Sequence, residues 1–133
     1  MKYTKLITAA TKAKAYSHSP YSKFRVGAAI LTRTGKIFTG CNIENSSFSL
    51  TICAERTAIS KAISEGQRRF SAVAITSDGI GFISPCGACR QVLLDLAGNI
   101  TVVMTDGSGN IKTAMMSELL PVPFTGDALS HKS

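Results

Sequence analysis

The sequence has no hydrophobic run close to the roughly 20 apolar residues that a membrane-spanning helix needs, so we expect no membrane partner. It also has no charged leader followed by an apolar segment and a cleavage site, and we expect no secretory signal. Repeats, low-complexity tracts and interdomain linkers are absent as well. The 133 residues therefore predict a single domain over residues 1–133 with one continuous core, whose tail after residue 129 is expected to be mobile.

Acidic residues are scarce at the start of the chain, where none precedes Glu44. Lysines and arginines are spread over the same segment, and the formal net charge of the chain is +7. Such a basic half can bind nucleic acid or an anionic surface. This segment lacks the interleaved aromatic residues on which single-stranded bases stack. We therefore interpret its basic residues as a solvated surface and expect no nucleic-acid partner.

Cysteines are also few, but three of the four stand in two short stretches, Cys53-Ala54-Glu55-Arg56 and Pro85-Cys86-Gly87-Ala88-Cys89-Arg90. Apolar residues at helical spacing follow each stretch, so the thiols are predicted at or near the N-terminal ends of two helices. Unpaired N–H groups and the helix dipole favour negative charge there, and they lower the pKa of a thiol. Thiols that bind metal rather than form disulfides suit a reducing compartment, and the cytosol is the expected location.

Three thiols in this arrangement predict one zinc ion per chain. The Cys86–Cys89 pair is one helical turn apart and can bind a single ion, with Cys53 as the third ligand. Catalytic zinc sites have three protein ligands and leave the fourth position to water, whose pKa falls toward roughly 7. Glu55 is interpreted as an acid/base group beside that water. Arg56 and Arg90 are predicted to compensate the charge of the sulfurs by hydrogen bonding to them.

Two other interpretations use the same cysteines. A Cys-x-x-Cys pair at a helix start also fits a thioredoxin-like disulfide between Cys86 and Cys89. A structural zinc site needs a fourth protein ligand, which Cys41 could supply, although we expect Cys41 to be a small buried residue of the core. A zinc or redox binding module is therefore the alternative to an enzyme.

The patterns Cys53-x-Glu55 and Pro85-Cys86-x-x-Cys89 together are the known signature of the zinc nucleobase deaminases in its three-cysteine form. Further segments match the same pattern: Pro20–Ala29, Gly40–Asn45, Cys53–Ala58, Ser84–Gln91 and Glu118–Pro121. On these segments the chain resembles the cytidine deaminase family, of the small homotetrameric type. The resemblance runs from about residue 3 to about residue 129.

The resemblance implies a fold and an activity. The fold is a cytidine deaminase-like three-layer α/β/α arrangement, an α/β protein with a mixed five-stranded sheet. The activity is zinc-dependent hydrolysis of cytidine and 2′-deoxycytidine to uridine and 2′-deoxyuridine plus ammonia, in cytoplasmic pyrimidine salvage, by a homotetramer whose active sites are shared between subunits. The alternative substrate is another cytosine nucleoside such as blasticidin S, although the run Asn42-Ile43-Glu44-Asn45 favours a ribose-bearing one.

The resemblance also implies roles for single residues. The expected roles are zinc binding by Cys53, Cys86 and Cys89, proton transfer by Glu55, contact with the ribose 3′-hydroxyl by Asn42 and Glu44, lining of the base pocket by Phe24, insertion from a neighbouring subunit by Phe124, and backbone contacts to the base edge and amine at Ala54 and Ser84. Phe48 stands where similar proteins commonly carry tyrosine, so a hydroxyl that could bridge subunits is missing there.

Hydrophobic periodicity and turn signals predict the order helix, hairpin, helix, strand, helix, strand, strand. The expected elements are a helix over 2–16, a hairpin of 24–31 and 36–41, a helix from Cys53 to near Gly66, a strand over 72–76, a helix over 86–96, a strand over 100–105, a short edge strand after the turn at 106–110, and a short helix over 115–120. This order gives a mixed sheet with helices on both faces. Both cysteine-bearing helices begin at one end of that sheet, where open α/β sheets tend to bind ligands.

Overall fold

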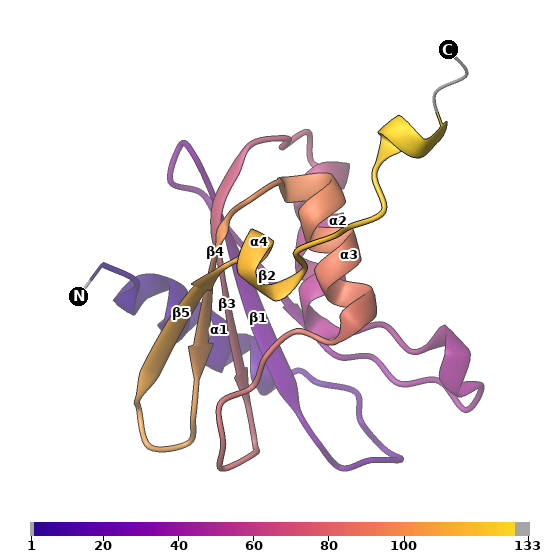
Figure 1. Cartoon of the computed structure of the whole chain (residues 1–133). Coiled ribbons are helices and arrows are strands. Elements are labelled where there is room, and N and C mark those ends of the chain that lie inside the picture. Colours follow the sequence, from indigo (N-terminus) through magenta and orange to yellow (C-terminus); the bar gives the residue numbers. More distant parts are fainter. Residues whose placement is uncertain (1, 130–133) are drawn as a thin grey trace.

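A five-stranded mixed sheet forms the middle of the molecule, with helices on both of its faces (Figure 1). The computed structural model describes residues 2–129. Its elements are α1 (Thr4–Lys14), β1 (Val26–Thr32), β2 (Ile37–Cys41), η1 (Phe48–Leu50), α2 (Ala54–Ser64), β3 (Phe70–Ser77), α3 (Gly87–Ala97), β4 (Thr101–Thr105), β5 (Ile111–Met115), α4 (Met116–Leu119) and η2 (Gly126–Leu129). Every predicted helix and strand is present and begins and ends within two residues of its expected bounds. The tail predicted to be mobile after residue 129 lies outside the described residues.

The strands lie in the order β2-β1-β3-β4-β5. β3 and β4 are parallel and are connected through α3, whereas the other neighbouring pairs are antiparallel. β1 and β2 form the predicted hairpin, and its turn contains Gly35 with a φ of 97°, a left-handed conformation that glycine adopts easily. β5 pairs only with β4 in this sheet and is the predicted edge strand.

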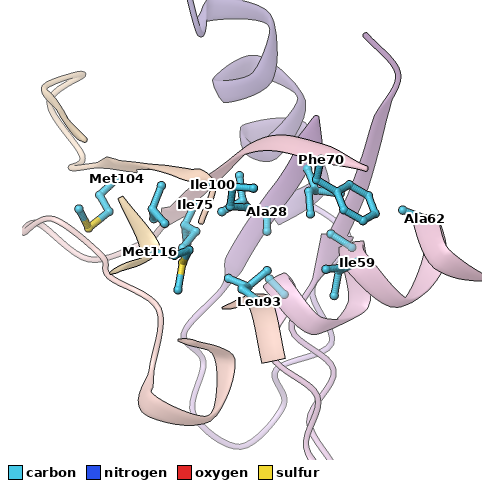
Figure 2. Packing of buried hydrophobic residues seen from close by; sticks show 14 residues of the cluster. Ala28, Ile59, Ala62, Phe70, Ile75, Leu93, Ile100, Met104 and Met116 are labelled. Atoms are coloured by element: carbon cyan, nitrogen blue, oxygen red, sulfur yellow. The ribbon is translucent and has the colours of Figure 1, made fainter. Parts of the chain in front are cut away.

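Successive residues of a strand point to opposite faces of a sheet, and here each face is covered by helices. On one side Ile59 of α2 and Leu93 of α3 belong to the same buried cluster as Ile75 of β3 (Figure 2). On the other side Leu6 of α1 packs in a second cluster with Ala74, the neighbour of Ile75 on β3. The three-layer α/β/α prediction is confirmed. Among the helices of residues 2–129, none has the length and apolar character needed to cross a membrane.

Two glycines allow the helices to lie close to the sheet. A Cβ atom at Gly27 of β1 would lie 2.0 Å from the carbonyl oxygen of Ala10, so α1 rests directly on this strand. A Cβ atom at Gly40 of β2 would lie 2.4 Å from the nitrogen of Ala58 and 2.5 Å from the oxygen of Ala54. Any side chain at Gly40 would therefore displace the first turns of α2. This close contact sets the position of the helix that begins at Cys53.

Candidate active site

The three cysteines of the two stretches lie at the starts of α2 and α3. Cys53 is the N-cap of α2, with φ −71° and ψ 154°, and Cys86 is the N-cap of α3, with φ −65° and ψ 168°. Cys89 follows in the first turn of α3 and is fully buried. The prediction that the thiols stand at or near helix N-termini is confirmed. The N-terminal end of a helix is a position where negative charge is stabilised.

The sulfur atoms of these cysteines form one cluster. All three lie within 4.8 Å of one another, and those of Cys53 and Cys86 are 3.9 Å apart. Two sulfurs bound tetrahedrally to one zinc ion at about 2.3 Å lie about 3.8 Å apart, so the spacing fits that ion. Soft thiolate ligands also suit zinc chemically. The three sulfurs can therefore hold one zinc ion.

The thiols of Cys53 and Cys89 have pKa values shifted in opposite directions. A hydrogen bond with the Cys89 thiol is the main cause that lowers the pKa of Cys53 to about 5, and Arg56 adds to the effect while burial opposes it. The same hydrogen bond, together with burial, raises the pKa of Cys89. Cys53 is thus the first of the two to ionise. A metal ion can begin to bind at a sulfur that is already charged at neutral pH, and it releases the remaining protons as it binds.

Glu55 is a buried residue, only 4% exposed. Burial is the main cause that raises its pKa to about 7, and the charge of Cys53 acts in the same direction. A group with a pKa near the working pH can both accept and donate a proton, which is what general acid–base catalysis requires. Glu55 is therefore suited to proton transfer beside the sulfur cluster.

The two arginines next to the cysteines have different partners. Arg56 donates through Nη2 to the carbonyl oxygen of Thr51 at 3.0 Å and to Cys53 Sγ at 4.0 Å. Its Nε is buried and has no hydrogen-bond partner among the described residues. Arg90 instead donates to the oxygens of Pro85, Leu119 and the Ser84 side chain, and not to sulfur in the part of the chain described. The geometry thus supports compensation of the sulfur charge by Arg56. Arg90 instead stabilises the loop that precedes α3.

A cavity of about 170 Å³ lies beside the sulfur cluster, and we refer to it as the cysteine cavity. Its lining includes Cys53, Cys86, Glu55, Asn42, Ala54 and Ser84. The structure therefore brings two metal-binding thiols and the buried carboxyl group together with three residues expected to contact substrate. Their sequence positions span more than forty residues, and the folding of β2, α2 and the 78–86 loop around one space unites them.

The side-chain amide of Asn42 is held in one orientation. Its Oδ1 accepts hydrogen bonds from the backbone N–H of Val26 at 3.0 Å and from the hydroxyl of Ser17. Its Nδ2 donates to the carbonyl oxygen of Phe24 at 2.8 Å, which leaves one N–H free of these bonds. Asn42 can therefore donate to a ligand hydroxyl but has little capacity left to accept. Ser17 is not predictable as a partner of Asn42, because a lone serine in a loop carries no signal of the residue that it will contact.

Glu44 lines a second cavity, of about 400 Å³, which we call the Glu44 cavity. Its carboxylate accepts hydrogen bonds from the backbone N–H groups of Tyr21 and Ser22, at 3.0 and 3.1 Å, and from the Ser22 hydroxyl. The Ser22 side chain is the main cause that lowers the pKa of Glu44. Thr51 lines both this cavity and the cysteine cavity, so the two are neighbours. Phe48 also lines the Glu44 cavity, with its ring in edge contact with that of Tyr21.

Phe24 lines a third cavity, of about 300 Å³, which shares Ile83 and Ser84 with the cysteine cavity. The segment around it is fixed by Arg25, which donates to both carboxylate oxygens of Asp78 at 2.9 and 3.1 Å. This pairing lowers the pKa of Asp78 to about 2. The Arg25–Asp78 pair joins the residue after Phe24 to the end of β3, and the sequence offered no sign of it.

Phe124 is placed apart from these cavities. It lines none of the three, and its side chain is 59% exposed. The structure thus brings all expected site residues to one region except this one, which the resemblance assigns to a neighbouring subunit.

Cys41 does not belong to the sulfur cluster. It is half-buried on β2 and lines a different cavity, between α1 and α2, so its predicted place in the core is only partly correct. Among the described residues, the metal-binding cluster contains three cysteines and no fourth ligand. All four cysteines are free thiols. The arrangement is that of a site with an open position rather than of a closed structural zinc site.

Comparison with known proteins gives consistent matches over nearly the whole chain. Residues 1–105 match the family described as "Cytidine and deoxycytidylate deaminase zinc-binding region". The chain is 48% identical to a cytidine deaminase of Sporosarcina psychrophila, over 98% of this chain and 97% of that protein. It is similar to the crystal structure of a cytidine deaminase from Burkholderia pseudomallei with a TM-score of 0.90 and 44% identity, over 93% of this chain and 100% of that chain. A blasticidin-S deaminase of Bacillus cereus is more distant, at 37% identity over 78% of this chain and 79% of that protein.

Proposed function

The chain belongs to the zinc-binding cytidine and deoxycytidylate deaminase family, and we propose that it hydrolyses cytidine and 2′-deoxycytidine to uridine and 2′-deoxyuridine with release of ammonia. We place this reaction in cytoplasmic pyrimidine salvage. The observation that carries the proposal is the cysteine cavity, where a buried carboxyl group with a pKa of about 7 lies beside the metal-binding thiols. Hydrolytic removal of an amino group needs a nucleophile and a group that transfers protons in the same small space.

The metal and the carboxyl group have separate tasks. When bound by Cys53, Cys86 and Cys89, zinc supplies a Lewis acid that makes water nucleophilic near neutral pH. Glu55 accepts a proton from the attacking water and delivers it to N3 of the cytosine ring. It then carries the second water proton to the departing exocyclic amine. Water thus supplies the new C4 oxygen and both transferred protons, and ammonia leaves.

The substrate is proposed to span the neighbouring cavities. The base occupies the cysteine cavity, where the backbone at Ala54 and Ser84 can contact its edge and its amine. The ribose extends toward Thr51 and the Glu44 cavity. The remaining N–H of Asn42 and the carboxylate of Glu44 form a donor and an acceptor that suit a sugar hydroxyl.

We propose that the protein assembles as a homotetramer with shared active sites. Several large apolar residues are exposed: Phe48 at 69% in the lining of the Glu44 cavity, Leu50 at 63% in η1, and Phe124 at 59% in the C-terminal segment. Exposed apolar groups of this kind are typical of surfaces that bind another protein. A second copy of the chain is the proposed occupant, since Phe124 is then available to a neighbouring pocket. We expect Phe48 to contact the neighbouring subunit through packing of its ring, without the hydroxyl group that a tyrosine would offer.

A metal count combined with an activity assay tests the proposal. We expect one zinc ion per chain and steady conversion of cytidine to uridine, followed by the loss of ultraviolet absorbance. Turnover of blasticidin S with none of cytidine would assign the alternative substrate. A reversible Cys86–Cys89 disulfide in a protein without turnover would support the binding or redox module instead.

A further inference from the structure

The side chain of Gln91 holds the backbone of Phe124 through two hydrogen bonds. Its Nε2 donates to the carbonyl oxygen of Phe124 at 2.6 Å, and the backbone N–H of Phe124 donates to its Oε1 at 3.1 Å. Gln91 is on α3, two residues after Cys89. Figure 1 shows the C-terminal segment crossing α3 and then leaving the body of the molecule, with η2 at its outer end. Gln91 is therefore where the zinc-binding helix fixes the course of this segment.

The fixed residue does not serve its own cysteine cavity. Phe124 is 59% exposed and is absent from the lining of that cavity. Val122 and Leu129 in the same segment are 89% and 66% exposed. The backbone of Phe124 is thus held by two hydrogen bonds while its aromatic side chain is in solvent. This arrangement is suited to contact with another molecule.

We propose that Gln91 is a positioning residue that holds Phe124 ready to close the substrate pocket of a second copy of the chain. This inference rests on the proposed deaminase function and on the proposed assembly. Gln91 touches neither substrate nor metal in this scheme. It acts on the neighbouring active site through the backbone of its own Phe124.

The chemistry of the contact explains why a glutamine is required. A primary amide offers a donor and an acceptor side by side, and these match the N–H and C=O of one residue. In Q91E the carboxylate can still accept from the N–H of Phe124, but it cannot donate and would face the carbonyl oxygen. Q91A loses both bonds, whereas Q91N keeps the amide on a side chain one methylene shorter.

Steady-state kinetics distinguish a positioning role of Gln91 from a general loss of folding or of zinc binding. For Q91E and Q91A we expect a KM for cytidine about 3- to 10-fold higher, the range that loss of one aromatic contact gives, with kcat within about twofold and zinc still one per chain. Q67A is the matched control, because Gln67 is the other glutamine and no side-chain hydrogen bond is formed by it in the described residues. We expect Q67A to behave as the wild type. Unchanged KM in both Gln91 variants, or a fall in zinc content that accounts for the change, would overturn the proposal.

Mixed assemblies distinguish an effect on the neighbour from an effect within one chain. Q91E subunits are co-expressed with an excess of E55Q subunits, which cannot transfer protons but carry a well-placed Phe124. We expect the KM of the mixed assembly to return toward the wild-type value, because each active Q91E pocket then receives Phe124 from an E55Q neighbour. If Gln91 acted on the zinc site of its own chain, the KM would remain at the Q91E value.

Fluorescence gives a readout that needs no turnover. The chain contains no tryptophan, so F124W provides a single reporter at the position in question. Adding Q91E to F124W should shift the emission to longer wavelength and increase quenching by acrylamide. An identical spectrum and quenching in the two proteins would refute the positioning role even if the wild type failed to act on cytidine. Absence of wild-type turnover would instead contradict the proposed function.

Discussion

At the scale of single residues, Glu55 combines a chemical advantage with an energetic penalty. The residue is 4% exposed, and the loss of hydration on burial raises the pKa of its carboxyl group to about 7. The same loss of hydration disfavours its ionised form in the folded protein. A residue that only stabilised the fold would be apolar at this position. The pairing of burial with a carboxyl group is therefore a sign of function.

Replacement of Glu55 by glutamine tests the proton transfer. The amide keeps the size and polarity of the side chain but cannot carry a proton between water and substrate. We expect kcat to fall by roughly 10²–10⁴-fold, while zinc content and circular dichroism stay as in the wild type. Metal analysis alongside steady-state rates makes the comparison. If E55Q retained wild-type turnover, Glu55 would not be the acid/base group.

The pKa of Glu55 also predicts a pH dependence of stability in the metal-free, reduced protein. The folded-state pKa of about 7 lies above the ordinary value of 4.5, so the folded chain binds this proton more tightly than the unfolded chain. That contribution is fully present below about pH 4.5 and is lost as the pH rises through 7. E55Q lacks this contribution. The free energy of unfolding of E55Q minus that of the wild type should therefore increase by up to about 3 kcal/mol from pH 5 to pH 8. Urea denaturation at both pH values measures this, and a difference that does not change with pH would contradict it.

At the scale of the elements, the contact of α2 with β2 controls the site. Gly40 has no side chain, and this lets the first turns of α2 approach the strand closely enough to place Cys53 and Glu55. The metal site therefore depends on a residue that neither binds metal nor lines the cysteine cavity.

Substitution of alanine for Gly40 tests that dependence. The new Cβ would overlap backbone atoms of α2, so we expect a loss of about 1–3 kcal/mol in the free energy of unfolding and weaker zinc binding. Gly81 is the matched control, because a Cβ there meets no atom within 4 Å and its φ is not left-handed. Urea denaturation and competition with a zinc-binding dye give the two quantities. If G40A bound zinc with the affinity of the wild type, the metal site would not depend on the close contact between α2 and Gly40.

The helices and strands were predictable because their apolar residues repeat with clear periods. The predicted strand over 72–76 extends in the structure to Phe70–Ser77, since Phe70 is buried and Ser77 pairs with Val26 across the neighbouring strand. Both the burial of Phe70 and the pairing of Ser77 depend on parts of the chain outside this strand. The short helices η1 and η2 were missed because three or four residues are too few to show a period.

At the scale of the whole molecule, the predictable part of the site is the part encoded by short spacings. The thiols and Glu55 stand within two short stretches, so chemistry and helix signals identified them. Other contacts join residues far apart: Ser17 and Asn42 are 25 positions apart, Gln91 and Phe124 are 33, and Arg25 and Asp78 are 53. A single glutamine or aspartate does not indicate which distant residue it will bind. Such contacts follow only from the fold.

Assembly is the property of the whole molecule on which the shared active site depends. Leu50 of η1 is 63% exposed and lines none of the three cavities around the site, so a substitution there leaves those cavities of its own chain in place. We expect the wild type to have four times the chain mass of 14.1 kDa in light scattering. Introducing a charge by L50E should shift this mass toward smaller species, because burying an unpaired carboxylate in an apolar contact is strongly unfavourable.

Activity should follow assembly in the same variant. If Phe124 reaches the pocket of another copy, dissociated L50E chains retain zinc but turn over cytidine poorly, and their specific activity should rise with protein concentration. Y16E is the matched control, since Tyr16 is 82% exposed just beyond the end of α1 and lies outside both η1 and the three cavities around the site. It should leave both mass and activity unchanged. A monomeric L50E with full, concentration-independent activity would mean that each chain completes its own pocket, and the proposed sharing of sites would then be wrong.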